Sequence, residues 1–371
     1  MTGSSIWLRI VVAVIVLSSH RADCTEDVLS LRYKIGVDFR EGSYEWMSFV
    51  AFSPDGTMVA SNGGVSGAAG DGLSIWSFPA GTYVRSLRHR PWALSSDWRL
   101  MVSEDALIDM SNDRPLFALG RDGTKVAEAR FSPDGQHLAF VADKPPDDSP
   151  QVIRVVRTAD GQVTSRFGRR HTSALAYHPN NVTLASGHWD NVTLWDSLTG
   201  RREALLRGFG RYVYGVAFSK DGKLLAAGTD TGDLQIWDVP ARKRMHALKI
   251  GWGDVSQPAF SPDSTLVAAG TYADGTLSLV EVSTGQILSQ VKVSMFGCGS
   301  VAFSPDGRYV ITPSNGGQIG PRRFDKGGTI RVFEVTLGSH PSAALGPMPQ
   351  SHSAEPPQRE SAWPGPVSAG R

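Results

Sequence analysis

Residues 216–238 read VAFSKDGKLLAAGTDTGDLQIWD, and this stretch decides the fold. An apolar strand at 216–218 is followed by a turn at 219–222 and by a strand of small apolar residues at 224–228. A second turn then leads into a strand that ends in Trp237-Asp238. Asp-Gly pairs close tight antiparallel hairpins because glycine adopts positive φ without steric cost. Short apolar strands with turn signals about every eight to twelve residues predict all-β structure.

Variants of this pattern occur seven times between residues 50 and 335. Their turns begin, about forty residues apart, at Phe52, Leu94, Phe131, Tyr177, Phe218, Phe260 and Phe303. A repeat of that length with several strands per unit predicts a circular or stacked array. Paired alanines, such as Ala226-Ala227 and Ala268-Ala269, fit the crowded space near the axis of such an array. Trp76, Trp195 and Trp237 can fill the wider gaps farther out.

The third strand of several repeats ends in a recognisable dipeptide. Trp195-Asp196 and Trp237-Asp238 are clear copies, and Ile75-Trp76-Ser77 and Val332-Phe333-Glu334 are weaker ones. Through these residues and the Phe-Ser-Pro-Asp-Gly turns, residues 28–335 resemble the WD-repeat (WD40) β-propeller family. The resemblance implies an all-β fold, namely a seven-bladed β-propeller of four-stranded antiparallel blades.

The chain also departs from the family pattern. The Gly-His pair that usually opens each repeat is absent, so the family's His–Ser–Asp–Trp hydrogen-bond set is not expected to be complete. Ser186, Asp190 and Trp195 keep matching positions in the fourth repeat, where a partial network is expected.

The last repeat lacks a fourth strand, because a Pro-rich segment begins soon after Val335. Upstream of the first repeat, residues 28–35 have strand-like alternation. We expect this N-terminal strand to pair with residues 329–335 as the outer strand of the last blade. The pairing would close the ring and cover a sheet edge.

The two ends of the chain differ in composition from the repeats. Arg9 precedes the apolar run 10–17, which is too short to span a bilayer comfortably. Residues 1–24 therefore predict a signal peptide and an exported protein, secreted or periplasmic. The alternative is an uncleaved N-terminal segment that tethers the chain to a membrane. Residues 338–371 are rich in Pro, Ser and Ala and predict a disordered tail.

Charge and cysteine content narrow the partners. Thirty-seven basic and thirty-six acidic residues leave a formal net charge of +1. A chain with so little net charge has no overall electrostatic field to attract nucleic acid or anionic lipid. We therefore expect no nucleic-acid partner and no membrane contact by the propeller itself. We also expect a monomer. Cys24 and Cys298 are too few for a disulfide scaffold, and the expected topology places them at opposite ends of a blade.

Enlarged loops and aromatic residues mark one expected face. The second-to-third-strand connections 62–72, 143–150 and 314–328 are enlarged, and in the WD-repeat family such connections lie on a common face. The residues predicted to bind a partner there are Tyr44, Trp46, Trp92, Tyr212, Tyr214, Trp252, Phe296, Gln318, Arg322, Arg323 and Phe324. Exposed aromatic residues and arginines are typical of interaction hot spots. The structural alternative is that the aromatic residues cap the blade cores.

Catalytic interpretations have little support. The inner strands expected at 48–52, 215–218, 257–260 and 300–303 carry no acid or imidazole, and Glu128 of another repeat is a single exception. Metal or hydrolase chemistry would need several His, Asp or Glu side chains at the central channel. We therefore predict a non-catalytic protein–protein interaction scaffold, with no catalytic, metal or cofactor site. The alternatives are an exported propeller hydrolase or oxidoreductase that acts at the channel, and a glycan or small-ligand binder that uses the aromatic residues.

Overall fold

The computed structural model describes residues 28–36, 47–62, 72–120, 125–142, 152–168, 171–294, 297–314, 317–320, 323–325 and 329–337. The chain divides into two compact units, Met1–Thr336 and Leu337–Arg371, and the strands lie in the first unit. The signal peptide predicted at 1–24 and the tail predicted at 338–371 lie outside the described residues.

Four repeats form four-stranded antiparallel sheets whose strands pair in chain order. The first contains β2 (Val50–Phe52), β3 (Met58–Asn62), β4 (Leu73–Ser77) and β5 (Tyr83–Leu87). The second contains β6 (Ala93–Leu94), β7 (Leu100–Val102), β8 (Ala106–Asp109) and β9 (Arg114–Ala118). The third contains β10 (Val126–Phe131), β11 (His137–Ala142), β12 (Ile153–Arg157) and β13 (Val163–Phe167). The sixth contains β21 (Val255–Phe260), β22 (Leu266–Thr271), β23 (Thr276–Glu281) and β24 (Ile287–Lys292).

The last repeat takes its fourth strand from the beginning of the chain. Its sheet has the order β1–β29–β26–β25. The strands are β25 (Ala302–Phe303), β26 (Tyr309–Ser314), β29 (Thr329–Val335) and β1 (Leu29–Gly36). β1 runs antiparallel to β29, from Leu29 opposite Val335 to Gly36 opposite Thr329. The pairing predicted between residues 28–35 and 329–335 is therefore confirmed.

The fourth and fifth repeats depart from the predicted pattern of separate four-stranded blades, because they form one seven-stranded sheet. Its strands are β14 (Ala174–Tyr177), β15 (Thr183–Gly187), β16 (Trp189–Asp196), β17 (Arg202–Phe218), β18 (Leu224–Thr229), β19 (Asp233–Asp238) and β20 (Lys243–Lys249). The N-terminal half of β17 pairs with β16 and its C-terminal half pairs with β18. Gly208 and Gly210 have positive φ within this strand, which lets it bend without ending.

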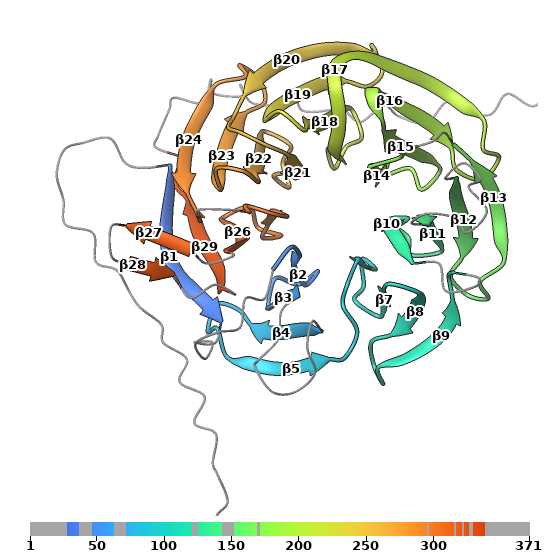
Figure 1. Ribbon diagram of the computed structural model, residues 1–371, viewed down its shortest axis with the longest axis horizontal. Coiled ribbons are helices and arrows are strands. Elements are labelled where there is room, and N and C mark those ends of the chain that lie inside the picture. Colours follow the sequence, from blue (N-terminus) through green and yellow to red (C-terminus); the bar gives the residue numbers. More distant parts are fainter. Residues whose placement is uncertain are drawn as a thin grey trace, which may run out of the picture. The chain divides into compact units, whose positions relative to one another are not determined.

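The first unit is an all-β propeller. Figure 1 shows its sheets side by side around a central axis, with β2, β10 and β21 near the centre and β5, β9 and β13 at the periphery. Buried apolar clusters fill the space between neighbouring sheets. One of them joins Val59 and Trp76 of the first sheet to Ile311 and Val332 of the last. Fully burying a side chain of this size contributes about 1.5–3 kcal/mol, so each contact between sheets stabilises the unit.

Small residues occupy the second strands, as predicted. Ala226 and Ala227 of β18 and Ala268 and Ala269 of β22 are completely buried. Cys298 is a free, buried thiol, and burial raises its pKa to about 12. Cys24 lies outside the described residues.

The recurring turn is held by its serine and aspartate. In the fifth repeat, Ser219 Oγ donates to Asp221 Oδ1 over 2.6 Å and accepts from the Leu224 N–H over 2.9 Å. Asp221 Oδ1 also accepts from the Lys223 N–H. The turn at Leu94 has the same bonds between Ser95 and Asp97, although it lacks the usual Pro and Gly. The Ser-x-Asp spacing is therefore sufficient to form this turn.

The fourth repeat contains a buried polar network that only partly matches the expectation. Trp195 Nε1 donates to Ser186 Oγ over 2.7 Å, as the matching positions predict. The hydroxyl of Ser186 also lies 2.7 Å from Nε2 of the buried His188, which was not predicted to contribute. Asp190 does not join these groups, because its Oδ1 accepts instead from the Gly210 N–H. The histidine of this network thus comes from the same hairpin as the serine.

Candidate functional site

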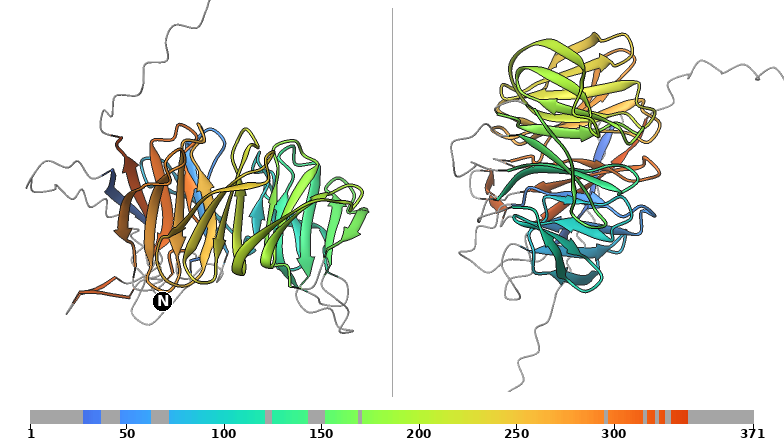
Figure 2. Two further views of the ribbon diagram at one scale, coloured as in Figure 1. Left: turned by 90° about the horizontal axis from the view of Figure 1, so that it is seen from above. Right: turned by 90° about the vertical axis from the view of Figure 1, so that its right-hand side faces the viewer.

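The three enlarged connections link second and third strands, as predicted. They join β3 to β4, β11 to β12 and β26 to β29. The last contains a hairpin that is not among the expected strands, β27 (Gly317–Gly320) and β28 (Arg323–Asp325). Figure 2 shows this hairpin beyond the strand ends of its own sheet. The Gly320-Pro321 dipeptide is the turn signal that could have predicted it.

The predicted partner-binding residues lie in different parts of the fold. Tyr44, Trp46, Phe296 and Arg322 lie outside the described residues. Gln318 and Phe324 pair through their backbones in the β27–β28 hairpin, as do Gly320 and Arg323. Trp92 is half-buried and packs on a cluster that includes Val102 and Val126. Tyr212, Tyr214 and Trp252 lie in β17 and in the connection after β20.

Exposed aromatic side chains occur at one end of three successive repeats. Trp189 is 52% exposed, Tyr214 42%, Trp252 69% and Tyr272 41%, and no other aromatic side chain in the described part of the chain is comparably exposed. Each of the four lies in or beside a connection from a second to a third strand, or from one blade to the next. Both kinds of connection lie at the same end of an antiparallel sheet. We call these four residues together with Tyr212 the aromatic surface. Trp189 and Tyr272 were missed because their connections are short.

Strand pairing holds three of these rings together. The pairing of β16 with β17 places Trp189 opposite Tyr212. Their rings meet edge to face with centroids 4.4 Å apart, and Tyr212 meets Tyr214 in the same way at 6.3 Å. Edge-to-face pairs are favourable because the positive edge of one ring approaches the negative face of the other. The three rings therefore form one continuous cluster.

Trp252 is held by the turn of the sixth repeat. Its backbone N–H donates to Asp274 Oδ2 over 3.2 Å, and its backbone carbonyl accepts from the Ala273 N–H over 3.1 Å. Lys249 Nζ lies 4.6 Å from the centroid of its ring. The aromatic surface thus already contains one cation placed over an aromatic face.

Asp230 and Asp254 are bonded through their backbones to residues of the aromatic surface. Asp230 follows β18, and its N–H donates to the carbonyl of Tyr212. Asp254 precedes β21, and its carbonyl accepts from the Tyr272 N–H. Burial, followed by the charge of Asp230, raises the pKa of Asp254. Burial and then Asp254 and Asp230 raise the pKa of Tyr214, so both acids lie near its phenol.

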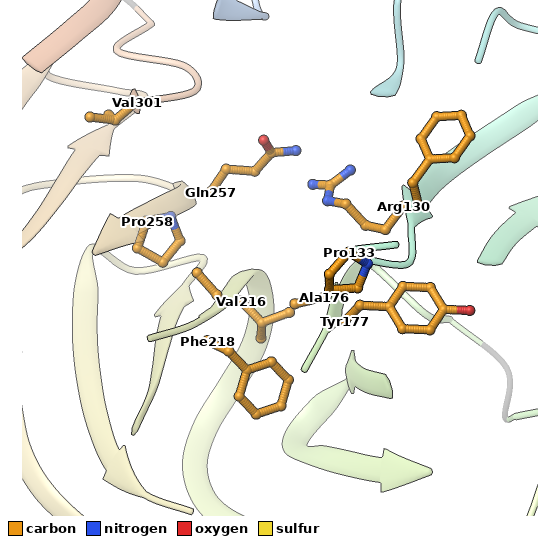
Figure 3. Close-up of a pocket in the computed structure, with 11 residues that line it drawn as sticks. Arg130, Pro133, Ala176, Tyr177, Val216, Phe218, Gln257, Pro258 and Val301 are labelled. Carbon is orange, nitrogen blue, oxygen red and sulfur yellow. The ribbon is translucent and has the colours of Figure 1, made fainter. Parts of the chain in front are cut away.

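A separate cavity lies between the inner strands. It has a volume of about 290 Å³ and is lined by residues from β10, β14, β17 and β21. Figure 3 shows the side chains of Arg130 and Gln257 extending toward each other. Arg130 Nη1 lies 2.8 Å from Oε1 of Glu128. Burial raises the pKa of Glu128, and the opposing effect of Arg130 is smaller.

The polar side chains that line this cavity are the guanidinium of Arg130, the amide of Gln257 and the phenol of Tyr177, and no carboxylate or imidazole lines it. Within the described ranges, no three His, Cys, Asp or Glu side chains gather as metal ligands would. Among the same residues, no helix is long and apolar enough to cross a membrane.

One family model and several known proteins match parts of the chain. Residues 200–238 match the family model described as WD domain, G-beta repeat. The chain is 27% identical over 182 residues to small ribosomal subunit protein RACK1y of Oryza sativa subsp. japonica, covering 46% of this chain and 50% of that protein. It is 30% identical to WD repeat-containing protein SL1-17 of Schistosoma mansoni, covering 40% and 44%. WD repeat-containing protein VIP3 of Arabidopsis thaliana is 28% identical, covering 42% and 51%. The matched segments span about half the length of these relatives.

Proposed function

We propose that this WD-repeat protein is a non-catalytic scaffold that binds a protein partner through the aromatic surface. The observation that carries this proposal is the position of the exposed aromatic side chains. Trp189, Tyr214, Trp252 and Tyr272 all lie at one end of three successive repeats. Tryptophan and tyrosine are enriched in interaction hot spots. Similarity to the WD-repeat relatives supports a scaffold, and the cavity lining offers no acid–base pair for catalysis.

We also infer that the unit is a closed ring of seven blades. On this view the seven-stranded sheet counts as two blades that share β17, one ending and the other beginning in that strand. The pairing of β1 with β29 and the buried cluster between the first and last sheets support closure of the ring.

Export remains our proposal for the location of the protein, because Arg9 and the apolar run 10–17 have the pattern of a signal peptide. Sequencing the N-terminus of the protein isolated from its natural source would test this. A new N-terminus near residue 24 supports cleavage and export. An intact N-terminus in the membrane fraction would support the tethered alternative, and an intact N-terminus in the soluble cell fraction would refute both.

Affinity capture with matched variants tests the scaffold proposal. The full chain is compared with a Trp189→Ala, Trp252→Ala double variant and with a Leu116→Ala, Met245→Ala double variant. Leu116 and Met245 are exposed apolar residues on β9 and β20, away from the aromatic surface. We expect the tryptophan variant to lose specific partners and the control variant to keep them. Identical partner sets for all three proteins would refute the placement of the binding surface.

A further inference from the structure

Asp230 and Asp254 are acids beside the aromatic surface whose carboxylates have no polar partner among the described residues. In the described residues, neither carboxylate receives a hydrogen bond or an ion pair, and Oδ1 of Asp230 is also shielded from solvent. Other acids nearby do have a polar partner for their carboxylates. Asp190 accepts from the Gly210 N–H, Asp233 lies 3.9 Å from Lys249 Nζ, and Asp274 accepts from the Trp252 N–H.

Close backbone packing brings these two acids beside Tyr214. A Cβ atom on Gly215 would lie 2.5 Å from the nitrogen of Gln257 and 2.9 Å from the carbonyl oxygen of Val255. A Cβ atom on Gly228 would lie 2.5 Å from the Cβ of Val255. The start of β21 therefore packs directly on β17 and β18. Asp254 consequently lies next to the residues that end β18 and begin the inner part of β17.

Among the described residues, no cation pairs with the carboxylate of Asp230 or of Asp254. Each of the two acids acts on the other or on the phenol of Tyr214 strongly enough to raise a pKa. Arg211 is exposed on β17 but pairs with neither acid. Lys249 is already engaged, since it lies over Trp252 and near Asp233. A cation supplied from outside the chain would relieve the repulsion between the carboxylates.

We propose that the protein partner presents a lysine or arginine side chain that binds between the rings of Tyr212 and Tyr214 and the carboxylates of Asp230 and Asp254. This inference rests on the proposed scaffold function and adds the chemistry of the partner. The aromatic rings contact the methylene groups of the basic side chain, and its cationic group lies over the face of a ring. The two carboxylates accept its hydrogen bonds, which are stronger than hydrogen bonds between neutral groups. Lys249 over Trp252 shows the same pairing of cation and ring within the chain itself.

Direct binding of a defined probe tests the proposal. The probe is a short fluorescein-labelled peptide of alternating arginine and serine, and a second peptide has lysine in place of arginine. In the control peptide, citrulline replaces every arginine, which keeps the shape and removes the charge. Fluorescence anisotropy with the full chain measures Kd at low and at physiological salt, because attraction between exposed charges weakens as salt rises.

The protein variants remove charge without removing volume. Asp230→Asn and Asp254→Asn are tested singly and together. Asp109→Asn is the matched control, because it removes one carboxylate at the C-terminal end of β8, which is the opposite end of its sheet. Thermal unfolding of each variant confirms that it is folded before binding is compared.

We expect at least one basic peptide to bind. The citrulline peptide should bind at least about tenfold more weakly, since a charge-assisted hydrogen bond is worth about that factor. The double variant should weaken binding of the basic peptide to a similar extent, and Asp109→Asn should leave it unchanged. Equal binding of the citrulline peptide, undiminished binding by the double variant, or no binding of either basic peptide would each overturn the proposal.

The capture experiment separates this inference from the scaffold function. If the tryptophan variant loses partners while the Asp230→Asn, Asp254→Asn variant captures the same proteins as the wild type, the surface is correct and the basic side chain is wrong. If neither variant loses partners, the scaffold proposal fails as well.

Discussion

The indole N–H of Trp195 donates to the hydroxyl of Ser186 over 2.7 Å in the buried core between the third and fourth sheets. This bond satisfies a polar group that has no access to water. Leaving such a group unpaired costs about 1–3 kcal/mol. We therefore expect Ser186→Ala to lower the free energy of unfolding by about 1–3 kcal/mol in urea titrations.

The control for this prediction is Ser74→Ala. Ser74 is also fully buried, but within the described residues its hydroxyl has no hydrogen-bond partner. Removing an unpaired hydroxyl should leave stability unchanged or slightly higher. Equal losses in both variants would show that the Trp195 bond has no special weight.

The strand at the beginning of the chain should contribute strongly to stability. Ile35 of β1 is completely buried with Val50, Trp76 and Val332. Ile35→Ala should cost about 2–5 kcal/mol, because it removes apolar contacts and leaves a cavity. Arg32 of the same strand pairs with Glu334 at the surface, and Arg32→Ala should cost at most about 1 kcal/mol. A minor effect of Ile35→Ala in thermal or urea unfolding would mean that β1 is dispensable.

The turn aspartates should make stability depend on acid pH. The hydroxyl of Ser53, followed by the Thr57 N–H, lowers the pKa of Asp55 to about 2 from its ordinary 3.8. Since the folded-state pKa is the lower one, Asp55 stabilises the fold above pH about 4 and loses that contribution as pH falls toward about 2. Ser53→Ala should move the carboxyl titration of Asp55, followed by NMR, toward 3.8.

Asp221 is an internal reference in the same experiment. Its pKa is lowered mainly by its own partner, Ser219, so Ser53→Ala should leave its titration where it is. A shift of both carboxyls would indicate a general change in the fold and would contradict the local assignment.

Asp254 should have the opposite effect on stability. Burial, together with Asp230, raises its pKa, so its protonated form favours the folded state. That contribution is present below pH about 4 and is lost as pH rises through the raised pKa. At pH 7 the ionised group therefore disfavours folding, and Asp254→Asn should raise Tm by about 1–2 °C. The gain should disappear in acid.

Asp109→Asn provides the contrast, because hydrogen bonds from Ser111 lower the pKa of Asp109. This variant should lower Tm at pH 7. If Asp254→Asn also lowers Tm at pH 7, the carboxylate is stabilising and our assignment of its environment is wrong.

Much of the fold could be predicted because each turn depends on a few local residues. Ser95 and Asp97 form the usual turn even though Trp98 stands where glycine is common, and Trp98 adopts a φ of 57°. The N-terminal strand was predictable from an unfilled position in the last sheet. The continuity of β17 was not, because Gly208 and Gly210 could equally have marked a loop between two strands.

The candidate site was less accessible to sequence analysis. The aromatic residues near inner strands could be anticipated, and Tyr212, Tyr214 and Trp252 were. Asp230 and Asp254 belong to different repeats and stand in ordinary polar connections. Their importance depends on the close approach of β21 to β17 and β18, which is a property of packing between repeats. The contribution of His188 likewise depends on the geometry of a folded hairpin.

The continuous strand β17 joins the fourth and fifth repeats through hydrogen bonds to both of them. A force or a fluctuation that opens one of the two sheets must break hydrogen bonds on the same strand that holds the other. Tyr212 and Tyr214 lie on this strand, so a partner bound there would contact a strand that is hydrogen-bonded to both repeats.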